Sequence, residues 1–219
     1  MSLAPSVGQT AWGRTIGGIV DDEGTRACAH PAGLCRPEAA TRDLADAIHA
    51  FCALHGAAPT LVEEASTAKG ADAVHDWLRD AAHALDRDRL WLAQLTAAIG
   101  PIPSTPRHAE SQATIKAQRH ALTTLAQSER TGCAPGAALA LLLDWHAIRD
   151  VLVAAAHRSG VEVIPEALPA RPAIIEAEAV ISAHPAHGRA ALFGAQQLIL
   201  QHRGLWHLLA ARAEARDAL

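Results

Sequence analysis

Apolar side chains recur along most of the chain at spacings of three and four residues, which is the pattern of helices with one buried face. The clearest stripe joins Val74, Leu78, Leu85, Leu92 and Ile99. Glycines and prolines interrupt the pattern and mark where the helices end. The spacing predicts six helices, over residues 38–55, 70–99, 106–130, 134–158, 172–183 and 187–214.

The segments between these helices indicate the topology. Thr105 is expected to cap the third helix, with Pro106 at its first position. Most connections are short, so consecutive helices should lie antiparallel. Strand-like alternation is almost absent, and residues 161–164 are the one candidate strand. We therefore predict an all-α fold, an antiparallel up-and-down bundle of four to six helices.

The first 37 residues differ from the rest because they are rich in glycine and proline. We predict that residues 1–37 form an irregular N-terminal arm packed on the bundle, and that residues 38–219 form a single helical-bundle domain. The fourth helix is apolar on nearly all sides over 137–143 and 151–156, so it should lie at the centre.

Composition excludes several classes of protein. Half of the 219 residues are apolar and 19% are charged, which is typical of a folded chain. No apolar run approaches the roughly 18 residues of a membrane span, so no membrane insertion is expected. Five Trp, two Phe and no Tyr are too few to stack single-stranded nucleic acid, and a net charge of −4 disfavours duplex binding. We therefore expect no nucleic-acid partner.

An alanine-rich and lysine-poor composition bears on source and compartment. The chain has 51 Ala, and its 19 basic residues include only two lysines. This bias is typical of a GC-rich bacterial genome and carries no functional weight. The N-terminus has neither a cationic start nor a continuous apolar segment, so we expect no signal peptide, no anchor and a cytoplasmic location. The four cysteines should then be reduced thiols.

Three predicted core faces carry a charge: Asp88 in the second helix, Asp144 in the fourth and Arg203 in the last. Turns near residues 103 and 132 fold the helices back, and they set the level of most polar residues along the bundle. Arg203 is placed by its face alone, because its helix follows a long linker. The candidate polar layer contains Asp88, Gln118, Arg119, His120, Asp144 and Arg203.

This polar layer allows two interpretations. A charge buried alone costs several kcal/mol, so it needs a partner. One interpretation is a structural network that pairs Asp144 with Arg203 and Asp88 with Arg119, with Gln118 filling the remaining bonds. Buried charges usually find partners rather than substrates, which favours this network. The other interpretation is a polar pocket, because bundles hold their ligands and metals in the interior.

The 13 histidines raise the question of a metal site. Asp-x-x-His spacings occur three times, but their aspartates, Asp46 among them, are expected to face solvent. Zinc ligands are also available at Cys28, His30, Cys35, His49, Cys52 and His55. However, the chain has no Cys-x-x-Cys knuckle, and the two histidines of the first helix face different directions. We expect a buried Cys52, exposed histidines and no metal site, and no cofactor is assigned.

Two functional hypotheses follow. The first is a soluble bundle that binds a small polar ligand or a single metal at the polar layer, with arginine holding an anionic group and one aspartate acting as acid or base. The second is a non-enzymatic scaffold or homodimeric interaction protein whose core charges are structural ion pairs. Its support is the fourth helix, which is apolar on more faces than a small bundle easily covers. A mostly buried fourth helix would weaken this hypothesis, and an exposed apolar face would strengthen it. The sequence leaves the enzyme status open.

Overall fold

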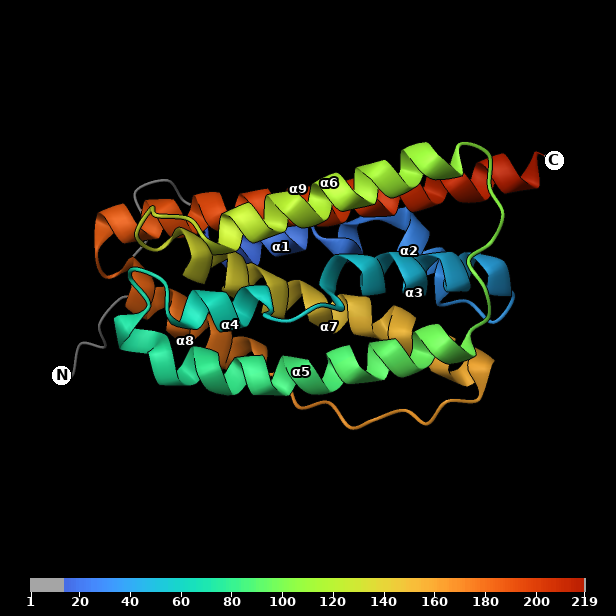
Figure 1. Ribbon diagram of the computed structural model, residues 1–219. Helices are drawn as coiled ribbons and strands as arrows, with labels where there is room; N and C mark the ends of the chain where they lie inside the picture. Colours follow the sequence, from blue (N-terminus) through green and yellow to red (C-terminus); the bar gives the residue numbers. More distant parts are fainter. Residues whose placement is uncertain (1–13, 219) are drawn as a thin grey trace.

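The computed structural model describes residues 14–218, which form nine α-helices and two short 3-10 turns with no strand among them (Figure 1). The all-α fold class is confirmed. No helix in this part of the chain combines the length and apolar character needed to cross a membrane. The helices are α1 (Ile16–Glu23), α2 (Ala29–Leu34), α3 (Thr41–His55), α4 (Leu61–Ser66), α5 (His75–Ala98), α6 (His108–Ala126), α7 (Cys133–Ser159), α8 (Arg171–Ser182) and α9 (Pro185–Asp217), and the turns are η1 (Thr25–Ala27) and η2 (Asp72–Val74).

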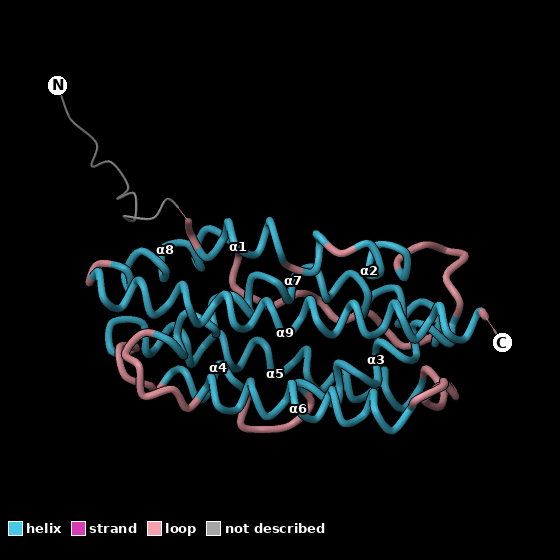
Figure 2. Tube along the Cα trace, turned by 90° about the horizontal axis from the view of Figure 1, so that it is seen from above, coloured by secondary structure: helices cyan, strands magenta, loops and turns pink. Residues whose placement is uncertain are grey.

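Helix α7 forms the centre of the bundle, as its sequence predicts. The other long helices all pack against it, and most of its residues are buried. Helix α9 is the longest, and it lies beside α7 through much of the molecule (Figures 1 and 2). Helix α5 runs along the opposite side of α7 (Figure 1). Residues on α7 can therefore meet side chains from every layer of the bundle.

Two glycines let α7 and α9 approach backbone to backbone. Gly136 on α7 faces the backbone of Ala191, and Gly194 on α9 faces the carbonyl of Cys133. A Cβ atom at either glycine would overlap these backbone atoms, so no side chain fits there. Small residues at the contact set the short distance between the two helix axes.

The start of α6 differs from the prediction. The helix begins at His108 rather than Pro106, and it follows Arg107, whose backbone is left-handed with a φ of 55°. Thr105 does not cap the helix. Its Oγ1 donates to the carbonyl of Pro103 (3.3 Å) and accepts from Arg216 Nη1 (2.8 Å). A tertiary hydrogen bond to α9 therefore overrides the local capping signal.

Helix α4 lies in a segment that the apolar spacing did not predict as helical. Its signal was a capping box. Thr60 Oγ1 accepts from Glu63 N (3.2 Å), and the Glu63 carboxylate accepts from Thr60 N (2.5 Å). The apolar residues Leu61, Val62 and Ala65 are buried. This short helix forms one wall of the pocket described below.

The predicted N-terminal arm is not irregular where it is described. Residues 16–34 form α1, η1 and α2, and residues 1–13 lie outside the described residues. Ile16, Ile19 and Val20 make a short apolar face that is buried as α1 packs on α7 and α9. Packing of this face outweighs the poor helix propensity of two glycines, which is why composition misled the prediction. Residues 161–164 are loop, not strand.

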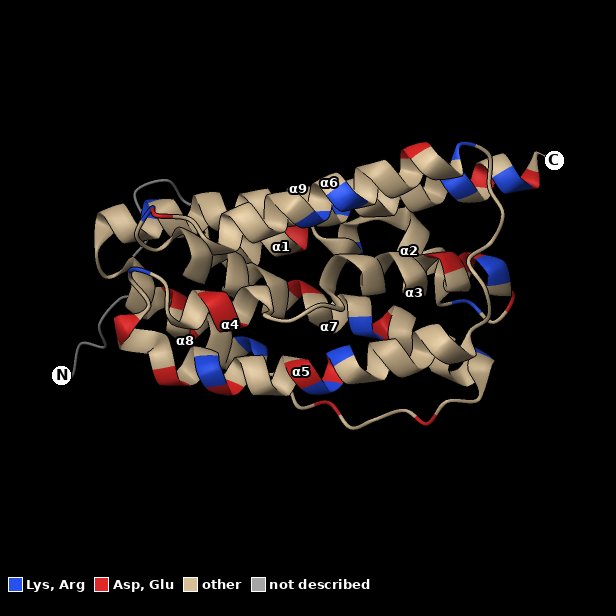
Figure 3. Ribbon diagram, in the orientation of Figure 1, with Lys and Arg blue, Asp and Glu red and all other residues tan. Residues whose placement is uncertain are grey.

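Charged residues are concentrated where the end of α9 meets the start of α3 (Figure 3). Asp46, predicted to face solvent, is buried and accepts from Arg212 Nε (2.8 Å) and Arg216 Nη1 (2.6 Å). Arg216 also pairs with Asp43 (2.7 Å). The prediction was wrong because α9 covers this face of α3 and supplies two arginines. These ion pairs fasten the C-terminal part of α9 to the bundle.

Candidate functional site

The carboxylate of Asp144, on α7, is buried inside the bundle with a full set of partners. One oxygen accepts from Thr25 N (2.7 Å), and the other accepts from Thr25 Oγ1 (2.7 Å) and His202 Nδ1 (2.7 Å). Trp206 Nε1 in turn donates to Thr25 Oγ1 (2.9 Å). Three hydrogen bonds therefore satisfy the buried carboxylate without an arginine.

His202 links this carboxylate to a second histidine. Its side chain is fully buried on α9, and its Nε2 lies 3.0 Å from Nε2 of His55 at the end of α3. Because His202 Nδ1 donates to the ionised Asp144, a neutral His202 has only Nε2 left as an acceptor. His55 therefore donates its Nε2 proton to His202. We refer to Asp144, His202 and His55 as the Asp–His–His chain.

His55 is neutral in the folded protein. Burial lowers its pKa well below the ordinary value of 6.5, and the adjacent His202 lowers it further. Its ring stacks on Phe51 at 6.2 Å and meets the Trp145 ring edge-on at 5.4 Å. These contacts fix the ring plane. No hydrogen bond joins His55 Nδ1 to any described residue, so this nitrogen is available as an acceptor.

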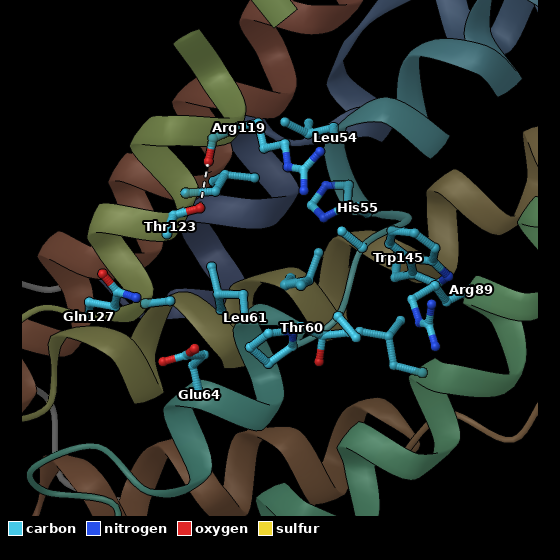
Figure 4. A pocket seen from close by; sticks show the side chains of 17 residues that line it. Leu54, His55, Thr60, Leu61, Glu64, Arg89, Arg119, Thr123, Gln127 and Trp145 are labelled. Carbon is cyan, nitrogen blue, oxygen red and sulfur yellow. Dashed lines mark hydrogen bonds between the residues drawn. The ribbon is translucent and has the colours of Figure 1, made fainter. Parts of the chain in front are cut away.

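His55 lines a cavity of about 260 Å³ between α3, α4, α5, α6 and α7 (Figure 4). We call this cavity the His55 pocket. Its walls are largely apolar, and its charged and polar side chains come from α3, α4 with the residue before it, α5 and α6 with the residue after it. The lining residues are Leu54, His55, Ala57, Ala58, Pro59, Thr60, Leu61, Glu64, Leu85, Arg89, Arg119, Leu122, Thr123, Ala126, Gln127, Leu141 and Trp145.

The charged residues of the pocket lie at different ends. Figure 4 shows the Arg119 guanidinium directed toward the His55 ring, whereas Glu64 lies on the far side of the cavity. Arg119 has no acidic partner among residues 14–218. Arg89 is partly satisfied, because it donates to Asp86 (2.7 Å) and to the carbonyl of Gly56 (3.1 Å). The His55 end is therefore the positive end of the pocket.

A second hollow, of about 660 Å³, touches the other end of the Asp–His–His chain at Asp144. Its polar side chains all have partners, either within the hollow or on neighbouring residues. His146 Nδ1 lies 2.5 Å from Glu166, and Arg171 lies 2.5 Å from Asp21. The His55 pocket instead offers unpaired groups, so it is the better candidate for a ligand.

Asp88 belongs to a separate structural pair. It is buried beneath α7, where its carboxylate accepts from Trp145 Nε1 (3.0 Å) and from Arg149 Nη1. Arg149 also donates to the carbonyl of Ile164 and lies over the Trp91 ring at 5.0 Å. With both of its oxygens bonded, Asp88 has no free group to offer a ligand.

The structure brings together fewer of the predicted polar-layer residues than expected. Gln118 is buried and donates to the carbonyl of Gln201 (3.0 Å). His120 is exposed, and Arg119 lies at the pocket without contacting Asp88. Arg203 pairs with Glu23 (3.4 Å) instead of Asp144. The expected ion pairs of Asp144 with Arg203 and of Asp88 with Arg119 are therefore wrong, because His202 and Arg149 occupy those places.

Two residues of the site were missed, although the sequence held a signal for each. His202 lies three or four residues from Leu198, Ile199, Leu205 and Trp206, all of them buried. That spacing places it on the interior face of α9. His55 continues the apolar stripe of α3 that passes through Phe51, so its expected exposure was inconsistent with its position.

The described residues offer no group of three or more His, Cys, Asp or Glu side chains arranged to hold a metal ion. Cys28 and Cys133 are buried and Cys35 is exposed, with all four thiols free. Cys52, expected to be buried, is only half-buried. The site is therefore built from hydrogen-bonded imidazoles and a carboxylate.

The model of a family of unknown function, DUF6975, matches residues 20–217, and the chain belongs to this family. The match covers the whole Asp–His–His chain and every residue that lines the His55 pocket. No curated protein and no solved structure matches the chain.

Proposed function

We propose that this protein binds a small organic anion in the His55 pocket. The supporting observation is that a largely apolar cavity is lined at one end by His55, whose Nδ1 atom has no hydrogen-bond partner in the described chain, and by the exposed Arg119, whose guanidinium has no acidic partner there. Ligand sites are commonly apolar cavities with a few convergent polar groups. A guanidinium presents paired N–H donors that match the two oxygens of a carboxylate.

The chemistry of the walls favours an anion with an apolar body. Leu54, Leu61, Leu122 and Leu141 would contact the body, and Trp145 offers a flat ring surface. The hydroxyls of the pocket are already engaged, since Thr60 Oγ1 accepts from Glu63 N and Thr123 Oγ1 donates to the carbonyl of Arg119. The charged end of the ligand therefore belongs with Arg119 and Arg89.

Titration of the purified protein with benzoate and with benzamidine, followed by ¹H–¹⁵N NMR, tests this proposal. The two probes share a ring and differ in the sign of their charge. We expect benzoate to shift the signals of pocket residues and benzamidine to bind at least about tenfold more weakly. Arg119→Gln should weaken benzoate binding about tenfold or more, since one charged hydrogen bond contributes about 1.5–3 kcal/mol.

Arg87→Gln is the matched control, because Arg87 is an exposed arginine on α5 that does not line the pocket. This variant should bind benzoate with unchanged affinity. Equal binding of both probes, or equal loss in the two arginine variants, would contradict the proposed anion site.

Burial of α7 weakens the alternative of a scaffold or homodimer. That hypothesis relied on apolar faces of α7 left uncovered by the bundle, whereas its neighbours bury α7 along most of its length. The large apolar side chains that remain exposed in the described chain are distributed over several segments, and such residues are ordinary on protein surfaces. They are Leu90, Ile102, Ile175, Val180, Phe193 and Leu200.

A further inference from the structure

The His55 pocket needs no buried carboxylate behind it in order to bind an anion. The Asp–His–His chain nevertheless spans three helices and places a carboxylate and an imidazole in the core, with a second, half-buried imidazole beside them. Burial of such groups is costly unless each is bonded. A negative charge two side chains behind the pocket would also weaken the binding of an anion. Anion binding alone therefore leaves the chain unexplained.

We propose that His55 is the general base of a proton-transfer reaction on a small organic anion, and that His202 and Asp144 position it and accept the transferred charge. The inference rests on the proposed binding function and adds a reaction to the same pocket. The order of the groups carries it: a carboxylate, a fully buried imidazole, and a second imidazole that lines the cavity and whose remaining nitrogen bonds no described residue.

The protons balance along the chain. A proton leaves a C–H bond of the ligand and binds His55 Nδ1, while the bonding electrons stay on the ligand. His55 then releases its Nε2 proton to His202 Nε2, across the 3.0 Å that separates these atoms. His55 returns to the neutral state, and the positive charge lies on His202 beside Asp144. Reversal of both steps returns the proton to the ligand or to its product, so no oxidant or further reactant is needed.

The transfer gives His55 a base strength that it lacks alone. A buried lone imidazole is a weak base, since desolvation disfavours its charged form. A proton passed to His202 instead meets the Asp144 carboxylate at 2.7 Å. The pair therefore takes up a proton more readily than His55 would by itself. The same logic underlies histidine–carboxylate pairs in other proton-transfer sites.

The other charged groups around His55 complete the site. Arg119 from α6 and Arg89 from α5 stabilise the negative charge that develops on the ligand. Glu64 from α4 lies across the cavity, and α7 contributes the neutral Trp145 ring. Each pocket hydroxyl is bonded to the backbone, and neither bonds a histidine or carboxylate of the described chain that could activate it as a nucleophile. Proton transfer is therefore the chemistry that these side chains support.

The ring opening of nitrobenzisoxazole tests the proposal without knowledge of the natural ligand. When a base removes the carbon-bound proton of this compound, its N–O bond breaks and a coloured nitrophenolate forms. We expect the protein to accelerate the reaction, and His55→Gln to lower the rate about 100-fold, within the range typical of general bases. His120→Gln, which changes an exposed histidine outside the pocket, should leave the rate unchanged.

The pH profile separates a positioning role from a merely structural one. In the unaltered protein the rate should rise with pH through the apparent pKa of the histidine pair and then level off. Asp144→Asn and His202→Gln remove the group that stabilises the transferred proton, so each should lower the rate and move this midpoint to lower pH. A uniform loss of rate with an unmoved midpoint would overturn the roles of His202 and Asp144.

Benzoate binding distinguishes this proposal from the one on which it rests. If benzoate binds as expected and the ring opening does not depend on His55, the anion site stands and the proton-transfer role is wrong. If neither benzoate binding nor a His55-dependent rate is found, both proposals fail. Should the Asp144 variant not fold, the rate of His55→Gln and the pH profile of the unaltered protein still decide the role of His55.

Discussion

The rings of His55 and His202 meet at right angles, with their Nε2 atoms 3.0 Å apart. Only one proton fits between two nitrogens at this distance, because two facing N–H groups would repel. The pair can therefore hold at most one positive charge. A proton taken up by the pair enters at His55 Nδ1 and displaces the shared proton toward His202.

Acidification should destabilise the fold through His55. Its pKa is lowered in the folded chain, so below a pH of about 6.5 the unfolded chain binds a proton that the folded chain does not. The stability associated with neutral His55 is fully present above that pH. It is lost as the pH falls toward the folded pKa, by up to about 1.4 kcal/mol per pH unit. Urea unfolding at a series of pH values measures this loss, and His55→Gln should flatten it; an unchanged slope would contradict the assignment.

Thr25→Val should destabilise the protein by about 2–3 kcal/mol, because the change leaves Trp206 Nε1 and one oxygen of Asp144 without their hydroxyl partner. Valine keeps the shape of threonine, so packing is little altered. Thr124→Val is the matched control, since that exposed hydroxyl bonds only to the carbonyl of His120. Its effect should stay within about 0.5 kcal/mol. Similar losses in urea unfolding would show that the hydroxyl of Thr25 is dispensable.

The buried pair of Asp88 and Arg149 should behave non-additively. Asp88→Leu alone leaves the Arg149 guanidinium without its carboxylate in the core, and a loss of about 3–5 kcal/mol is expected. Arg149→Met alone should lower the free energy of unfolding by a similar amount. The double variant replaces both charges by apolar groups and should recover much of the loss. A double-mutant cycle from chemical unfolding measures the coupling, and additive losses would contradict a direct pair.

Gly194→Ala should lower the free energy of unfolding by at least about 1–3 kcal/mol, because the new methyl group would overlap the carbonyl of Cys133 where α7 and α9 cross. Gly33→Ala is a fitting comparison, since nothing lies within 4 Å of the position its Cβ would take on α2. That substitution should be neutral or stabilising by about 0.5–1 kcal/mol. Thermal unfolding of both variants checks the contrast, and equal melting temperatures would refute the close crossing.

Most of the helical framework could be predicted from the sequence, because it depends on local spacing and on breakers such as Gly100 and Gly160. A central α7 followed in the same way from its continuous apolar run. Helix α1 could not be predicted, since its two glycines disfavour an isolated helix and only burial of Ile16 and Ile19 against α7 and α9 stabilises it.

The helical framework does not depend on the exact rotation of each helix about its axis, but the candidate site does. A rotation of α9 by one residue decides which polar side chain faces the core. His202 and Arg203 are neighbours about 100° apart on α9, and the apolar stripe allowed either to face inward. The structure places His202 in the core and leaves Arg203 partly exposed beside Glu23. Asp144 was expected on a core face, but its partners Thr25 and His202 come from distant segments that local spacing does not relate.

The most direct test of the Asp–His–His chain is a ¹⁵N NMR titration of the histidine ring nitrogens in the unaltered protein. Ring nitrogen shifts report which atom holds each proton, so they distinguish a neutral ring from an imidazolium. We expect the positive charge of the pair to appear on His202 as the pH falls, while His55 stays neutral with its proton moved from Nε2 to Nδ1. An imidazolium that forms at His55 near its ordinary pKa, with His202 unaffected, would contradict the account.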